Sequence, residues 1–99
     1  HSRLEIAYDL HPDYWRHGIT SKAVAAICAF AFTEIKINRV EAFTLPDNHP
    51  SIQLLLKLGF FQEGLLKEFR FYKGKYVDVS ILGLIRADYI QFKRHYPQP

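Results

Sequence analysis

Cysteine is nearly absent from the 99-residue sequence, which contains only Cys28. One cysteine cannot form an internal disulfide or supply a thiolate metal cluster, so disulfide scaffolds and zinc ribbons are excluded. A long hydrophobic run is also lacking, because the longest stretch without formal charge is residues 23–33. A membrane-spanning helix needs roughly 20 apolar residues. No charged segment followed by an apolar one opens the chain, so we expect no secretory signal and a cytoplasmic location.

Charge of one sign is not concentrated anywhere in the sequence. The 13 Lys and Arg residues and the 10 Asp and Glu residues leave a net charge of +3 with neutral histidines. Nucleic-acid-binding domains usually gather their basic residues in a stripe, so no nucleic-acid partner is expected. With 48% apolar residues, the chain has enough material for one folded domain and lacks the composition of a disordered protein.

The first part of the sequence predicts a strand, a loop and a helix. Apolar residues alternate over residues 4–10, which is the period of a strand with one apolar face, and Pro12 interrupts it. After the loop, residues 22–35 are apolar nearly all round, so this helix should be covered on more than one side. Thr20 or Ser21 is expected to cap it.

The second part predicts a further helix and three strands. Asn48 is a good N-cap for a helix over residues 51–58, and Gly59 stands where a left-handed residue would end it. Strands are expected at 40–45, 65–72 and 76–84, with a hairpin turn at 73–75 and a short amphipathic piece at 89–99. The order strand, helix, strand, helix, strand, strand indicates an α/β (α+β) domain with a mixed β-sheet and two helices.

The strand–loop–helix unit offers an anion-binding position. The free backbone N–H groups and positive end of a helix suit a pyrophosphate. Gly18 would let the ligand approach the backbone, and Arg16 and Lys22 would add positive charge. The spacing by itself is weak evidence, because a lone glycine before a helix is more often a turn residue.

Three ordered segments resemble one protein family. Residues 4–23, LEIAYDLHPDYWRHGITSKA, resemble the acetyl-CoA-binding segment of the GNAT N-acetyltransferase superfamily, in particular its RimJ/RimL-like branch, which acetylates ribosomal-protein N-termini. The segments NRVEA, PDNHPSI and KLGF within residues 38–60 resemble the next part of that branch, and EGLLK and YKGKYVDV within residues 63–79 resemble its closing hairpin.

The resemblance implies a GNAT fold and an N-acetyltransferase that moves acetyl from acetyl-CoA to a primary amine, with a protein N-terminus as one possible acceptor. It begins at the family's fourth strand, so residues 1–99 are expected to be a single GNAT domain lacking its N-terminal strands and helices. The first strand would then have an unpaired edge and the apolar helix an uncovered face. We therefore expect a homodimer, in which a second copy or a swapped element supplies the cover.

The resemblance also assigns residues to the cofactor. Backbone N–H groups from Trp15 through Ser21 would cradle the CoA pyrophosphate, Leu10 and His11 would lie beside the pantetheine, and Asn48 would orient the CoA arm. The family pattern is met imperfectly, since Trp15 replaces Gln or Arg and Thr20 replaces Gly or Ala. The cofactor-binding residues expected are Leu10, His11, Trp15, Arg16, His17, Gly18, Ile19, Thr20, Ser21 and Asn48.

Acetyl transfer needs a neutral amine, a polarised carbonyl and a hydrogen bond to the departing thiolate. Many family members use a tyrosine for the last role, and its position here is Leu55. The RimJ/RimL branch suggests Ser51 instead, which is otherwise an ordinary first-turn helix serine. The branch's base position falls on Arg70, which cannot accept a proton.

Carboxylates near that position are the remaining candidates for the base. Glu68 lies two residues before Arg70 and is therefore expected on the same face of the strand. Glu5 and Asp78 are further candidates, although Glu5 would otherwise be a surface residue and Asp78 an ion-pair partner. The proposed catalytic residues are thus Ser51, Glu68 and Glu5.

Other side chains are expected to do no chemistry. No histidine has metal-ligand spacing, so no metal is expected. Cys28 should be buried and inert. The aromatic residues of the last two strands, Phe69, Phe71, Tyr72 and Tyr76, should pack on the sheet, with lining of the acceptor groove as the alternative. Two alternatives stay open beside the enzyme: a CoA-binding domain without turnover and a self-associating domain. The sequence does not distinguish a ribosomal-protein N-terminus from spermidine, an antibiotic or another amine.

Overall fold

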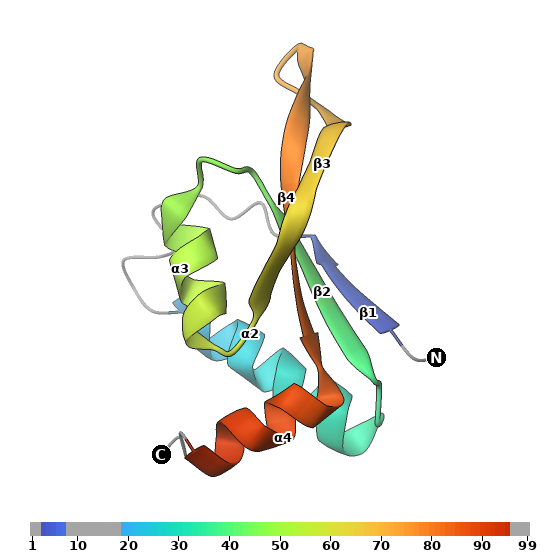
Figure 1. Cartoon of the computed structure of the whole chain (residues 1–99), viewed down its shortest axis with the longest axis vertical. Coiled ribbons are helices and arrows are strands. Elements are labelled where there is room, and N and C mark those ends of the chain that lie inside the picture. Colours follow the sequence, from blue (N-terminus) through green and yellow to red (C-terminus); the bar gives the residue numbers. More distant parts are fainter. Residues whose placement is uncertain (1–2, 8–18, 96–99) are drawn as a thin grey trace.

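A computed structural model describes residues 3–7 and 19–95, and within them a four-stranded sheet has helices on one face (Figure 1). The strand order is β1-β2-β4-β3, with β1 parallel to β2 and the other neighbours antiparallel. The elements in chain order are β1 Arg3–Ala7, α2 Ile19–Ala29, the π-helical turn η1 Phe30–Glu34, β2 Arg39–Thr44, α3 His49–Lys57, β3 Phe61–Tyr72, β4 Lys75–Ile85 and α4 Arg86–His95.

The connections explain this topology. Parallel strands need a long crossover, and α2 with η1 provides it between β1 and β2, whereas a tight turn joins the antiparallel β3 and β4. The expected fold class is confirmed. One element was underestimated: the tail predicted as a short amphipathic piece forms α4, a third helix that begins directly after β4.

The core lies between the sheet and the helices. Alternate residues of β2 and β4, such as Val40 and Leu82, meet Val24 and Leu55 from the helices in one cluster. Tyr89 of α4 closes it by stacking on Phe32, with ring centroids 4.7 Å apart. The helix-covered face therefore holds the chain's main hydrophobic contacts.

Cys28 is part of this core, as the sequence predicted. Its side chain is buried, and burial raises the pKa of the thiol to about 12. A thiol that stays protonated at neutral pH is a poor nucleophile and metal ligand.

Among the described residues, the sheet and the other helices cover one side of the apolar helix, so the expected cover of a further side by a second copy stays a prediction. Val24, Cys28 and Phe32 are buried, but the opposite surface of α2, η1 and the following residue leaves Ile27, Phe30 and Ile35 exposed. No helix in residues 19–95 is long and apolar enough to cross a lipid bilayer.

The other face of the sheet carries a row of ion pairs across the strands, which we call the ion ladder (Arg3, Glu5, Arg39, Glu41 and Glu63). Arg39 Nε donates to Glu41 Oε2 at 3.0 Å, and its Nη1 donates to Glu63 Oε2 at 3.1 Å. Arg3 joins Glu41 at 3.5 Å and Glu5 at 3.2 Å. The hydrogen bond with Arg39 holds the pKa of the Glu63 carboxyl below its usual value.

Gly83 allows the one ion pair of the ladder that crosses over an intervening strand, between Arg39 and Glu63. Arg39 is on β2 and Glu63 on β3, so their side chains meet above β4, which lies between those strands. A Cβ atom at Gly83 would lie 2.7 Å from Arg39 Nη2 and 2.7 Å from Glu63 Oε2. The missing side chain therefore leaves the space that this ion pair occupies.

Gly83→Ala is expected to displace the Arg39–Glu63 pair and lower the free energy of unfolding by about 0.5–1 kcal/mol, the range of partly exposed ion pairs. Gly64→Ala is the matched control, because its Cβ would meet only Ile81 at 3.9 Å. Urea unfolding at pH 7 measures both variants. Arg39 lowers the pKa of Glu63 in the folded state. The pair therefore adds to the free energy of unfolding above pH 4.5, the pKa of Glu63 in the unfolded chain, and this addition is lost as the pH falls through the lower pKa of the folded state. Equal stability of the two variants would contradict this role of Gly83.

The β3–β4 hairpin extends beyond the rest of the sheet (Figure 1). Lys73 and Gly74 have φ angles of 51° and 82°, which is the pair of positive values that a type I′ hairpin turn requires. The aromatic residues of this hairpin, which were expected to pack on the sheet, do so only in part: Tyr72 is half-buried, whereas Phe69, Phe71 and Tyr76 are exposed. Phe69 stacks on Phe43, and Phe71 meets Tyr76 edge to face. Beyond the helices there is no second layer among the described residues to bury them.

Candidate active site

The site is built where β2 ends and α3 begins. Asn48 is the N-cap of α3, as predicted, and its side-chain oxygen accepts the backbone N–H of Ser51 at 3.3 Å. Pro50 occupies a first-turn position, where its missing N–H has no intrahelical partner to lose. Gly59, with φ of 98°, follows the helix end in the predicted left-handed conformation. The cap and the proline fix where the first turn of α3 stands.

Ser51 presents a buried hydroxyl at this helix start. The residue is 0% exposed, and its Oγ has no hydrogen-bond partner within the described part of the chain. Thr44, the last residue of β2, has the same two properties, with 1% exposure. Buried hydroxyls without a partner are uncommon because they lose the hydrogen bonds of water. Both groups therefore have unused hydrogen-bonding capacity next to the N-terminus of a helix.

Leu55 follows Ser51 by one turn on the same buried face of α3. It is 0% exposed and belongs to the hydrophobic core with Ile52 and Phe60. The position at which the resemblance placed a tyrosine is thus an aliphatic core contact in this chain. Ser51 is the group on that face of α3 with a proton to donate.

A pocket of about 410 Å³ adjoins the loop before α3, and we call it the hairpin pocket. The loop and the tip of the β3–β4 hairpin form its walls, with two carboxylates and two ammonium groups among mainly apolar surfaces. Its lining residues are Leu45, Pro46, Asp47, Tyr72, Lys73, Lys75, Val77 and Asp78.

Glu68 and Asp78 lie together at an irregularity of β3. Leu66 pairs with Val79 of β4, and Arg70 pairs with Val77. Three residues, 67–69, separate the two positions on β3, whereas only Asp78 separates them on β4. Glu68 has φ of 45°, and its backbone N–H donates to Asp78 Oδ1 at 2.8 Å. The expectation that Glu68 shares a face with Arg70 relied on regular alternation, which a bulge of this kind interrupts.

Glu5 stands elsewhere in the sheet. Its register partner on β2 is Glu41, three residues before Thr44, which corresponds to roughly 10 Å along a strand. The Glu5 side chain is exposed and contacts Arg3 in the ion ladder. The structure therefore joins the Glu68 backbone to Asp78, which lines the hairpin pocket, and does not bring Glu5 to them.

Most of the predicted cofactor loop falls outside the described residues, namely Leu10, His11, Trp15, Arg16, His17 and Gly18. Ile19, Thr20 and Ser21 form the first turn of α2, so the helix begins earlier than predicted and neither Thr20 nor Ser21 is its N-cap. First-turn backbone N–H groups have no intrahelical acceptor, which is what the anion-binding prediction needs of them. No three His, Cys, Asp or Glu residues gather as a metal site in the described ranges.

Two features of this region were not predicted from the sequence. Thr44 continues the inward-facing alternation of Val40 and Ala42, and that pattern would have placed its hydroxyl on the buried face of β2. The lysines at the hairpin turn were treated as turn residues only. Their position beside Asp47 depends on how far the hairpin reaches past the sheet, which local pattern does not show.

Comparison with known proteins identifies relatives over most of the chain. The model of the acetyltransferase (GNAT) domain family matches residues 1–61. An uncharacterized N-acetyltransferase of Bacillus licheniformis, p20, is 41% identical over 87 residues, covering 88% of this chain and 49% of the relative. The uncharacterized N-acetyltransferase YoaA of Bacillus subtilis is 31% identical, covering 87% of this chain and 49% of its own length. The chain thus spans about half the length of these curated relatives.

Solved structures show the same fold. The ribosomal-protein-S5-alanine acetyltransferase of Vibrio fischeri superposes with a TM-score of 0.79 at 27% identity, covering 89% of this chain and 48% of that one. The spermidine N-acetyltransferase of Vibrio cholerae, solved in complex with CoA and spermine, superposes with a TM-score of 0.79 at 22% identity, covering 91% and 53%. At that identity the second likeness concerns the fold alone.

Proposed function

The chain belongs to the GNAT acetyltransferase family, and on that premise we propose that the protein transfers the acetyl group of acetyl-CoA to a primary amine. The observation that carries the proposal is Ser51, a fully buried hydroxyl without a hydrogen-bond partner in the described residues, in the first turn of a helix capped by Asn48. Such a hydroxyl is available to a ligand at the place where the resemblance puts the CoA thiol.

We assign the cofactor roles as the resemblance implies them. Residues 10–11 would line the pantetheine, residues 15–21 the pyrophosphate, and Asn48 the CoA arm. Support comes from α2, whose first turn starts at Ile19 and leaves its backbone N–H groups without intrahelical acceptors. Acetyl-CoA is a co-substrate here, and no metal is needed by the chemistry.

In the proposed reaction the neutral amine nitrogen attacks the thioester carbonyl carbon. A C–N bond forms, the C–S bond breaks, and the electron pair leaves on sulfur, where the Ser51 hydroxyl donates a hydrogen bond. The amine proton passes to a carboxylate. We favour Glu68 with Asp78 over Glu5, because Asp78 lines the hairpin pocket and accepts the Glu68 backbone N–H at 2.8 Å, whereas Glu5 contacts Arg3 in the ion ladder.

For the acceptor we propose the N-terminal amine of a protein, with a ribosomal protein as the first candidate. The RimJ/RimL-like segments of the sequence support this choice, and a ribosomal-protein acetyltransferase is among the structural relatives at 27% identity. Spermidine is the rival, because spermidine acetyltransferases share the fold.

An acceptor panel tests the proposed activity. The 99-residue chain is incubated with acetyl-CoA and either short N-terminal peptides or spermidine, and release of free CoA thiol is followed together with the mass of the acceptor. We expect a gain of one acetyl group on the peptide amine. Binding of acetyl-CoA without any acetylated product would favour the alternative, a CoA-binding domain without turnover.

We further propose that residues 1–99 belong to one GNAT domain and that the protein self-associates as a homodimer. The exposed Ile27, Phe30 and Ile35 and the position of β1 at the sheet edge support a need for cover. Sedimentation at micromolar concentration measures this, and a strict monomer would contradict it. The expected cytoplasmic location stays a prediction.

A further inference from the structure

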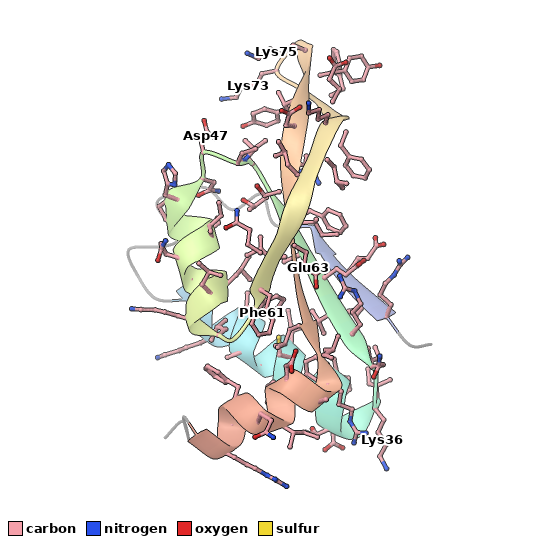
Figure 2. The ribbon with its side chains drawn as sticks, in the orientation of Figure 1. Lys36, Asp47, Phe61, Glu63, Lys73 and Lys75 are labelled. Carbon is pink, nitrogen blue, oxygen red and sulfur yellow. The ribbon has the colours of Figure 1, made fainter. Side chains whose placement is uncertain are left out.

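The lining of the hairpin pocket combines two ammonium groups with two carboxylates. Lys73 and Lys75 come from the tip of the β3–β4 hairpin, and Asp47 comes from the loop before α3. Figure 2 shows the two lysines at the hairpin tip and Asp47 at the top of the neighbouring loop, on the same side of the hairpin. The pocket therefore offers both signs of charge to one small ligand.

The hairpin turn holds the two lysines of the pocket in place. Positive φ angles at Lys73 and Gly74 make the turn tight, so Lys73 and Lys75 are both presented from the tip. The Lys73 ammonium lies 5.3 Å from the centroid of the Tyr72 ring, a cation–π contact that draws it toward another pocket residue. Tyr72 is the register partner of Lys75.

The carboxylates of the pocket are Asp47, from the loop before α3, and Asp78, from β4. Asp78 is half-buried, and its Oδ1 accepts the Glu68 N–H at 2.8 Å, which fixes the carboxylate next to the bulge. Asp47 is exposed and directly precedes Asn48, the N-cap of the helix that carries Ser51. An amine bound between these carboxylates would be adjacent to the proposed site of acetyl transfer. Leu45, Pro46 and Val77 supply apolar surface around it.

We propose that the hairpin pocket selects an acceptor that carries a carboxylate close to its amine, with the amine on the Asp47 side and the carboxylate on the lysine side. This inference rests on the proposed function and specifies its acceptor. A polyamine would place its further cationic nitrogens toward Lys73 and Lys75, where like charges repel. The acceptor chemistry is therefore that of an acidic amino acid or of a protein N-terminus with an acidic residue beside it, and polyamines are disfavoured.

The test measures binding, so it does not depend on turnover. Calorimetry with CoA present compares free glutamate, a short peptide with a free N-terminal amine and glutamate second, the same peptide with glutamine second, and spermidine. We expect one of the two glutamate ligands to bind more tightly than both the glutamine peptide and spermidine. If free glutamate is that ligand, the acceptor is an amino acid; if the peptide is, the acceptor is a protein N-terminus.

Charge-removing variants assign the effect to the pocket. The double variant Lys73→Gln/Lys75→Gln should bind the preferred glutamate ligand about threefold to tenfold more weakly, because each partly exposed ion pair contributes modestly to affinity. The same variant should bind spermidine more tightly. Asp47→Asn should lower the affinity for both the glutamate ligand and spermidine. Lys36→Gln is the control, because Lys36 is an exposed lysine at the opposite end of the molecule (Figure 2) and should change neither.

Two results would overturn the inference: tighter binding of spermidine than of either glutamate ligand by the unmodified chain, or an equal response of the glutamate ligand to the Lys73/Lys75 and Lys36 variants. Failure of the proposed function looks different. In that case acetyl-CoA itself does not bind, as measured in a separate titration without acceptor.

Discussion

Replacing Ser51 by alanine is expected to lower the rate of acetyl transfer about a hundredfold, the lower end of what a positioned proton donor contributes. The departing thiolate would lose the one hydroxyl in the first turn of α3 that is buried and unpartnered. Affinity for acetyl-CoA should stay unchanged. The helix cap should also persist, because Asn48 accepts the backbone N–H of residue 51 and alanine retains that group.

Stability separates this role from a structural one. Removing a buried hydroxyl that has no partner leaves thermal stability unchanged or raises it slightly. Ser80→Ala is the matched control, because Ser80 is another buried serine, located on β4 opposite Thr44. Its rate should stay close to that of the unmodified chain. If Ser51→Ala turned over normally, or if it lost rate only in proportion to lost folded protein, Ser51 would not act in the reaction.

Replacing Leu55 by alanine should lower the free energy of unfolding by about 2–5 kcal/mol, the usual loss for a fully buried leucine in a packed core. The side chain is 0% exposed and packs in the cluster that joins α3 to the sheet. The position matters for mechanism, because the resemblance assigns it to the tyrosine that many family members use at the thiolate. In this chain the residue holds the helix that positions Ser51.

Leu56→Ala provides the comparison, because Leu56 is the next residue of the same helix and is 39% exposed. It should lose less than about 1 kcal/mol, as substitutions of exposed residues do. Urea unfolding followed by circular dichroism gives both values. Similar losses for the two variants would mean that α3 is not packed on the sheet in the described way.

Local signals in the sequence were sufficient for most of the secondary structure. Asn48 and Gly59 marked the start and end of α3 because capping and positive φ depend on a few neighbouring residues. Residues 89–99 were underestimated because the helix begins at Arg86, directly at the end of a strand, with no turn residue to announce it. The buried face of β2 could be predicted from the alternation of apolar residues, and the fold class from the order of the elements.

Features that need contacts between distant residues were not predictable in the same way. The placement of Glu68 relied on a period of two, and the bulge opposite Asp78 interrupts that period. The link from Arg39 to Glu63 passes above Gly83 on a strand that is far along the sequence from Arg39. The hairpin pocket likewise joins residues 45–47 to residues 72–78, which only the folded sheet brings together.

Titration of the 99-residue chain with acetyl-CoA in a calorimeter, at physiological salt and without acceptor, shows whether the chain binds the proposed co-substrate. We expect saturable binding with a micromolar Kd, because the proposed roles assign the pyrophosphate to the first turn of α2 and the thiol to the start of α3. Absence of binding heat up to millimolar acetyl-CoA would contradict it and would leave the family membership as a likeness of fold without its cofactor.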